Sequence, residues 1–223
     1  AVGEPSVTLA FGEAATCTIT SNDISPTLRV VKTILNDNGG NVNDPDAFGL
    51  RVDGSSVLDS VVNNIKAGAR VVSEDGLPGY EAGSWGGDCA ANGSITLALE
   101  QVATCTITND DIAPTLTLIN TIVNDNNGNV TDPNAFGLMV GVVAVDDGVS
   151  NTFDVGSYTV SAAAVTGYQA STWGGDCATD GSITLTNGQD ATCTIIHDDI
   201  PPTLQVVKTI RNDNGGTVSN PNF

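Results

Sequence analysis

The feature that most constrains this chain is an internal repeat of 88 residues. Three segments are copies of one pattern: Pro26 to Gly40 (PTLRVVKTILNDNGG), Pro114 to Gly128 (PTLTLINTIVNDNNG) and Pro202 to Gly216 (PTLQVVKTIRNDNGG). Self-similarity at a fixed period is the signature of a tandem array. The sequence therefore predicts two whole repeats, 26–113 and 114–201, between the C-terminal part of a preceding repeat (1–25) and the N-terminal part of a following repeat (202–223).

Turn signals and residue usage predict an all-β fold. Short runs rich in Val, Thr and Ile are separated by NG, DG, GG and DP pairs, and no segment keeps a helical period. Such runs are typical of antiparallel sheets. The repeats are joined by six-residue segments that end in proline, 109–114 and 197–202, and these favour short, stiff joints. We therefore expect tandem Ig-like β-sandwiches.

The charge limits the classes of partner. The chain has 26 acidic and 7 basic residues, a formal charge of −19, which argues against nucleic acid and anionic membranes as partners. The sequence contains no apolar run long enough to cross a membrane and no signal-peptide pattern. We expect a soluble extracellular protein, secreted or displayed on a cell surface, whose partners are neighbouring repeats or other subunits of a fibre.

The cysteines follow the repeat. Cys89 and Cys105 are 16 residues apart, and Cys177 and Cys193 have the same separation at the same positions of the next repeat. This pattern predicts one disulfide per repeat, in keeping with an oxidising compartment. Cys17 corresponds to Cys105, and its partner would fall at Ala1, so its state stays open.

The loops after the repeated strand are rich in oxygen-bearing side chains. Unit one has Asp37, Asn38 and Asn41, and unit two has Asp125, Asn126 and Asn129. Such side chains before a glycine resemble part of a calcium loop, although the terminal Glu of a full loop is missing. The alternative is an Asx-rich turn, because Asn and Asp tolerate left-handed backbone and bond to their own main chain. Calcium is the one cofactor that the sequence leaves open.

Three polar residues of the first repeat are predicted to face its core. Alternation places Lys32 in one row with Leu28 and Val30. The same reasoning turns Glu74 and Asn109 inward. In the second repeat the corresponding residues are Asn120, Ala162 and His197, so all three positions change together.

Because the three positions change together, we interpret their side chains as acting together in one reaction. An amine in an apolar core loses its proton and becomes nucleophilic, and a buried carboxyl polarises an amide and carries protons. We therefore interpret Lys32 and Asn109 as candidates for an intramolecular isopeptide bond, with Glu74 as the helper. The alternative is a buried Lys32–Glu74 ion pair with Asn109 as a hydrogen-bonding neighbour. In the second repeat, Asn120 and His197 are expected to hydrogen-bond instead.

At these residues the sequence resembles a known family. The motifs VVKT at Lys32, Glu74 followed by Pro78-Gly79-Tyr80, and TITN ending at Asn109 are similar to Cna-B/SpaA-type prealbumin-like domains, in a disulfide-bearing branch. The resemblance implies β-sandwiches in tandem in bacterial adhesins and pilus shafts, many of which contain a Lys–Asn cross-link with an acidic helper.

These observations predict a structural protein rather than an enzyme, and at most a single self-directed bond-forming step. We expect the stalk or shaft of a bacterial surface fibre, adhesin or filament, with units closed by disulfides and, in some, an isopeptide bond. Two alternatives stay open. One is a calcium- or ligand-binding module that uses the divergent middle of each repeat. The other is a self-assembling filament subunit in which 202–223 adds a strand to another chain.

Overall fold

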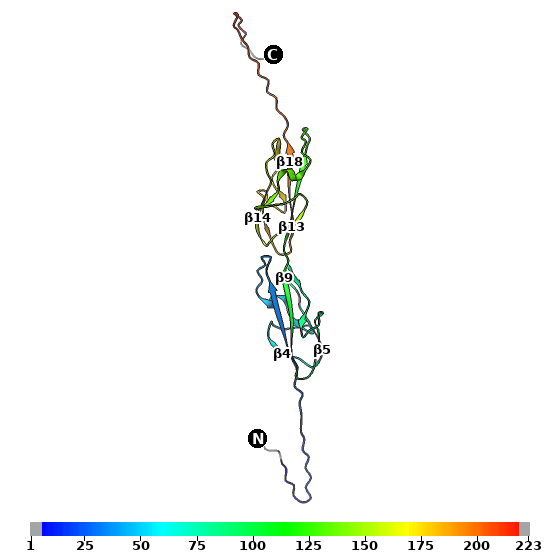
Figure 1. The fold of residues 1–223 in the computed structure, drawn as a ribbon. Helices are drawn as coiled ribbons and strands as arrows, with labels where there is room; N and C mark the ends of the chain where they lie inside the picture. Colours follow the sequence, from blue (N-terminus) through cyan, green and yellow to red (C-terminus); the bar gives the residue numbers. More distant parts are fainter. Residues whose placement is uncertain (1–5, 219–223) are drawn as a thin grey trace. The chain divides into compact units, whose positions relative to one another are not determined.

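The computed structural model describes residues 6–218, and within them two β-sandwiches form, each from two sheets (Figure 1). The all-β prediction is confirmed. The helices of the described part are the short 3₁₀ helices η1 (Pro45–Phe48) and η2 (Pro133–Phe136). No helix among residues 6–218 has the length and apolar character needed to cross a membrane.

The first sandwich contains a five-stranded and a four-stranded sheet. The five-stranded sheet has the order β4 (Val62–Asn64), β1 (Thr27–Leu35), β9 (Val102–Asp111), β6 (Tyr80–Ala82), and β7 (Gly86–Gly87) also pairs with β9. The four-stranded sheet has the order β3 (Ser55–Ser56), β2 (Arg51–Val52), β5 (Gly68–Ser73), β8 (Ser94–Leu97).

The second sandwich repeats this plan strand for strand. Its five-stranded sheet has the order β13 (Ser150–Thr152), β10 (Thr115–Val123), β18 (Asp190–Asp199), β15 (Tyr168–Ala170), with β16 (Gly174–Gly175) also paired to β18. Its four-stranded sheet has the order β12 (Val143–Ala144), β11 (Met139–Val140), β14 (Gly156–Ser161), β17 (Ser182–Leu185).

The first and last strands of each sandwich are neighbours. In the second sandwich β10 and β18 run parallel in a nine-residue register, from Thr115 opposite Asp190 to Val123 opposite Asp198. In the first sandwich β1 lies beside β9. This adjacency places position 32 next to position 109 although 77 residues separate them, and so it builds the candidate site.

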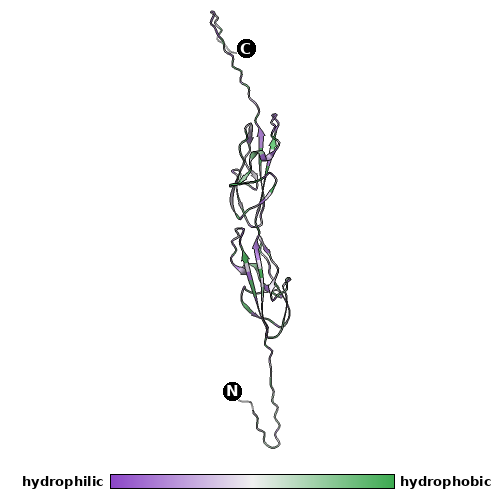
Figure 2. Ribbon diagram, viewed as in Figure 1, coloured by the Kyte–Doolittle hydropathy of each residue, from purple (hydrophilic) through white to green (hydrophobic). Residues whose placement is uncertain are grey.

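Each core lies between its two sheets, as the alternation predicts. Leu28 and Val30 of β1 are completely buried, and so is Cys105 of β9. Figure 2 shows β1 mostly in the hydrophobic colour and the C-terminal end of β9 in the hydrophilic one. The chemistry-bearing residues therefore lie toward the ends of these two strands, beyond the apolar part of the core.

The WGGD motif is a tight turn that requires glycine. Gly87 has a φ of 70°, and a Cβ there would collide with the carbonyl oxygen of Thr104. Gly175 has the same conformation against Thr192. Left-handed backbone with a close main-chain neighbour favours glycine. The turn leads into Cys89 or Cys177, so it sets the approach of each cysteine to the last strand.

The flanking parts of the array form no strands within the described residues. Leu204 and Val206, the copies of buried Leu28 and Val30, are exposed, and residues 6–25 are exposed as well. A lone strand without partners is not stable in water, which accounts for the difference from the strands expected there. Ala1 lies outside the described residues. The compact units of the chain also cut across the repeats, because Ile34–Asn43 and Leu77–Glu81 group with the second unit, so the repeat boundaries stay a prediction.

Candidate functional site

The structure brings Lys32, Glu74 and Asn109 together inside the first sandwich. Lys32 Nζ donates to Glu74 Oε2 in a short contact, and Asn109 Nδ2 donates to Glu74 Oε1 over 2.7 Å. Lys32 comes from β1, Asn109 from β9, and Glu74 follows β5 directly. The carboxyl group thus joins the amine of the first strand to the carboxamide of the last.

This triad is removed from water. The side chain of Lys32 has no exposed surface, that of Glu74 is 6% exposed, and Asn109 is 1% exposed. Burial lowers the pKa of Lys32, against the opposing effect of the hydrogen bond and charge of Glu74. The Phe48 ring lies 4.0 Å from Nζ and shields the amine. Desolvation of this kind favours the neutral, nucleophilic amine.

One atom of the triad has no partner. Asn109 Oδ1 is the buried side-chain oxygen or nitrogen that lacks a hydrogen bond among residues 6–218. Such an atom is costly in a folded core. The two ends of a carboxamide have nearly the same shape, so turning the group would direct Oδ1, in place of Nδ2, to the carboxyl group of Glu74. A proton donor at Oδ1 would polarise the carbonyl carbon for attack by an amine.

A positioning contact was missed by sequence reasoning. Asp59 Oδ1 accepts a hydrogen bond from the backbone N–H of Lys32 over 2.7 Å, and the backbone N–H of Asp59 donates to Asp46 Oδ1 over 2.6 Å. The edge strand β4 pairs only with Thr27–Arg29, so Asp59 takes the place of a strand beside Lys32. The same bonds recur in the second sandwich, where the Asn120 N–H donates to Asp147 Oδ1 and the Asp147 N–H donates to Asn134 Oδ1. Asp147 stands 88 residues after Asp59, so the repeat of this aspartate in both units was the signal in the sequence.

In the second sandwich the corresponding site holds a hydrogen-bonded pair. His197 Nδ1 lies 2.7 Å from Asn120 Oδ1, and the His197 ring stacks on Phe136 with centroids 4.0 Å apart. Both polar residues are buried, and Asn120 Nδ2 also donates to the carbonyl of Pro133 over 3.1 Å. Burial lowers the pKa of His197. The pair contains no amine, and Ala162 stands at the position of the acidic Glu74, so this site lacks the groups for a Lys–Asn amide bond.

Each sandwich contains one disulfide. Cys89 is bonded to Cys105 and Cys177 to Cys193, and each pair has a Cα–Cα distance of 5.1 Å. The bridge ties the WGGD turn to the last strand next to it. Trp85 and Trp173 pack against the respective cores close to these bridges. Cys17 is a free, exposed thiol.

The predicted calcium residues come together only in part. The carboxylate oxygens of Asp37, Asp110 and Asp111 lie within 4.8 Å of one another, and so do those of Asp125, Asp198 and Asp199. Coulombic repulsion from Asp110 is the main cause of the raised pKa of Asp37. Asn38 and Asn126 instead donate their side-chain amides to main-chain oxygens of the last strand, and Asn41 and Asn129 are exposed and outside the acidic groups.

The buried acids Asp111 and Asp199 act as clamps on these loops, a role that sequence reasoning did not assign. Asp111 accepts backbone N–H bonds from Asn38 over 3.1 Å and Gly40 over 2.6 Å. Burial would raise the pKa of Asp111, but these bonds outweigh it and hold the pKa below its usual value. Asp199 is held in the same way by Gly128 and Asn126. Each loop is therefore held by a buried carboxylate that already binds backbone N–H groups. Calcium binding at these loops stays a prediction.

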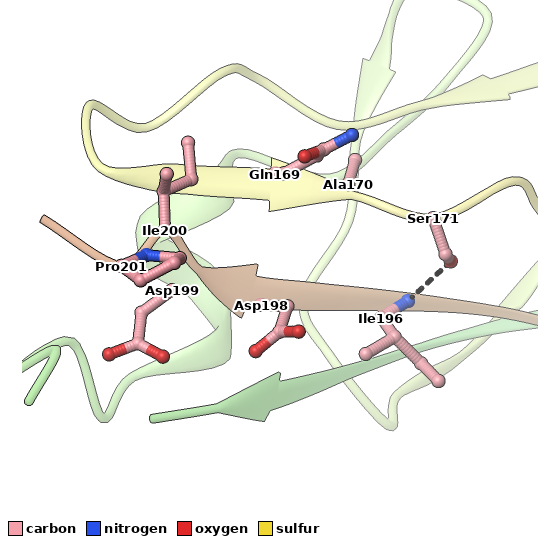
Figure 3. A pocket seen from close by; sticks show the side chains of 8 residues that line it. All are labelled: Gln169, Ala170, Ser171, Ile196, Asp198, Asp199, Ile200 and Pro201. Atoms are coloured by element: carbon pink, nitrogen blue, oxygen red, sulfur yellow. Dashed lines mark hydrogen bonds between the residues drawn. The ribbon is translucent and has the colours of Figure 1, made fainter. Parts of the chain in front are cut away.

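A shallow hollow of about 350 Å³ lies on the outer side of β15 and β18 (Figure 3). Figure 3 places Gln169 on β15, Ser171 just after its end, and Ile196 and Asp198 on β18. The Ser171 hydroxyl already accepts a bond from the Ile196 N–H. Another hollow, of about 390 Å³, includes Asp53 and Arg70, which pair with each other in the divergent middle of the first repeat. In neither hollow do several charged side chains converge on one position, as a binding site for a charged ligand would require.

The comparisons agree with this geometry. The sequence matches the prealbumin-like fold domain family SpaA_2 twice in tandem, over residues 23–107 and 111–195. The chain belongs to this family. Among curated proteins no match was found. The two matched segments coincide closely with the two sandwiches, so each is a prealbumin-like domain.

Solved structures with low sequence identity were also found. The Bacillus anthracis TIE protein is 13% identical, with 80% of this chain and 34% of that chain covered and a TM-score of 0.46. A Streptococcal ancillary pilin is 12% identical, with coverages of 82% and 64% and a TM-score of 0.30. The major pilin T-13 from Streptococcus pyogenes is 12% identical, with coverages of 82% and 98% and a TM-score of 0.26. The prealbumin-like pair thus spans about a third of the first protein and just under two thirds of the second.

Proposed function

We propose that this chain is part of the stalk or shaft of an extracellular, surface-displayed fibre, and that its first prealbumin-like domain is closed by a Lys32–Asn109 isopeptide bond. The observation that carries the proposal is the buried carboxyl of Glu74 between the amine of the first strand and the carboxamide of the last. The tandem domain family and the two disulfides support the extracellular, structural part.

The proposed step balances without any other reactant. The neutral Nζ of Lys32 attacks Cγ of Asn109, the Nζ–Cγ bond forms, and the Cγ–Nδ2 bond breaks. Glu74 takes one proton from Nζ and passes one to Nδ2, which leaves as ammonia. The step occurs once and the side chains are consumed, so the domain is the product of its own chemistry and not a catalyst of turnover.

The test is the mass of the whole chain after reduction and denaturation. We expect the wild-type chain to be lighter than its sequence by one ammonia, and the Lys32→Ala and Glu74→Ala variants to have the full mass. Full mass in the wild type would contradict the bond and leave the buried ion pair as the explanation. The second domain is an internal control, because it has no Lys or Arg at all.

Trypsin locates the bond. The chain has no Lys or Arg between Arg70 and Lys208, so Asn109 lies in the peptide 71–208. An amide on Nζ blocks cleavage after Lys32 and joins peptide 30–51 to peptide 71–208. Separate peptides cut after Lys32 would place any mass loss elsewhere in the chain.

A further inference from the structure

We propose that the second prealbumin-like domain is a force-extensible element whose extension is limited by the Cys177–Cys193 disulfide. The inference rests on the proposed shaft function for the tension that would act on it. The expected response to force is argued from three features of the second domain: the pairing of its first and last strands, the side chains that connect these strands, and the position of the disulfide.

The end strands are arranged so that tension acts on them in shear. The chain enters the domain at Thr115, the start of β10, and leaves at Asp199, the end of β18. Because the strands are parallel, with Thr115 opposite Asp190 and Val123 opposite Asp198, these two points lie at opposite ends of the pair. Pulling therefore loads the hydrogen bonds along the whole ladder at the same time. Forced opening of such a pair is governed by its unfolding rate.

Only non-covalent groups connect the two strands. At the site where Lys32 and Asn109 meet in the first domain, the second domain has the Asn120–His197 hydrogen bond. A single hydrogen bond of this kind contributes little to the stability of the strand pair, whereas an amide bond is covalent and would hold under the same tension. The second domain therefore yields, while a cross-linked first domain would transmit the tension directly from β1 to β9.

The disulfide lies outside this load path. It joins Cys177 to Cys193, so it closes the short stretch between β16 and β18 and leaves β10 unconnected. After the strands separate, residues 115–177 and 193–199 are free to extend. At about 3.4 Å per residue this is roughly 230 Å of chain, against about 30 Å between the ends of the folded strand pair. The expected gain is about 200 Å, and reduction of the disulfide would add about 50 Å.

The experiment is single-molecule pulling on the whole chain through handles at its two ends. For the wild type we expect one step of about 200 Å. For Lys32→Ala we expect two such steps, since the first domain has the same strand plan and the same disulfide spacing. With Cys177→Ser and Cys193→Ser together, the wild-type step should lengthen to about 250 Å, which assigns it to the second domain.

The outcomes separate this inference from the isopeptide proposal. Two steps of about 200 Å in the wild type would refute the isopeptide bond while supporting the extensible second domain. The absence of any step up to handle rupture would refute the extensible element, and an unchanged step length in the double cysteine variant would refute the disulfide limit. If that variant does not fold, addition of reductant after the first step provides the same measurement, because Cys193 is buried until the strand pair opens.

Discussion

His197 takes the place of Asn109 in the second domain, and its Nδ1 lies 2.7 Å from Oδ1 of Asn120, which takes the place of Lys32. The two domains therefore fill the same buried polar position in different ways. One has an amine, a carboxyl and a carboxamide in contact, and the other has an amide–imidazole pair that depends on the protonation state of the imidazole.

The amide–imidazole pair makes the second domain sensitive to acid. Burial lowers the pKa of His197 below 6.5, so the unfolded chain binds more protons than the folded one below that pH. The free energy of unfolding is therefore highest above pH 6.5 and falls as the pH decreases toward the folded pKa. We expect the Tm of the second domain to fall between about pH 7 and pH 5, measured by calorimetry on the whole chain. In His197→Gln, which cannot titrate, the decrease should be smaller; an equal decrease would assign the acid effect to other groups.

The shared scaffold predicts that the triad can be transferred. Combining Asn120→Lys, Ala162→Glu and His197→Asn places the same three side chains on β10, after β14 and on β18. If the strand plan supplies the geometry, the chain should become lighter by one further ammonia. The double variant with Ala162 kept is the control and should not lose the second ammonia. No additional loss in the correctly folded triple variant would show that residues outside the triad are needed.

The hydrogen bonds that Asp199 accepts predict that this residue stabilises the second domain, although it stands in an acidic run that resembles surface. Asp199→Ala leaves the backbone N–H groups of Asn126 and Gly128 without their acceptor. We expect a loss of about 2–3 kcal/mol in the free energy of unfolding of the second domain, measured in urea. The exposed neighbour gives the control, since Asp198→Ala should change it by less than about 0.5 kcal/mol. Equal effects of the two variants would argue against the clamp.

The calcium hypothesis predicts a saturable rise in Tm on addition of calcium. A site formed by Asp37 with Asp110 and Asp111 would stabilise the fold by mass action, and Asp37→Asn should reduce the rise. Magnesium at the same concentration is the control for general screening of the acidic surface. If both ions give the same gradual change, these loops are Asx-rich turns clamped by Asp111.

Much of the fold follows from the repeat and from strand alternation. Those patterns place Lys32 and Asn109 on inward faces, and the coordinated change at positions 120, 162 and 197 singles out the triad from residue identities alone. The same alternation also places Asp111, two residues after Asn109, on the inward face of the last strand, but its NDD run resembles exposed surface and does not indicate which groups it binds. Its burial depends on a loop about 70 residues earlier folding back to donate its N–H groups.

The contact that supports Lys32 is only partly visible in the sequence. Asp59 lies in the most divergent part of the repeat, although Asp147 is its copy 88 residues later. Its bond to the Lys32 backbone could not be foreseen, because it depends on β4 pairing with β1 no further than Arg29. Phe48 appears in the sequence as an ordinary core residue, and only the turn of η1 brings its ring to the amine. These are tertiary effects, which local periodicity does not encode.

The pairing of first and last strands also fixes when a domain can be completed as the chain is made. β10 must wait for β18, whose residues follow 75 positions later, and until then the edge of β10 that pairs with β18 has no partner strand. Strand pairs so distant in sequence form slowly and leave apolar edges open to wrong partners. In an array of repeats whose first and last strands are similar, the wrong partner most readily available is the last strand of a neighbouring copy. The coordinated differences between the buried sites of the two domains would make such a mispaired strand a poor substitute, with His197 opposite an amine or Asn109 opposite an amide.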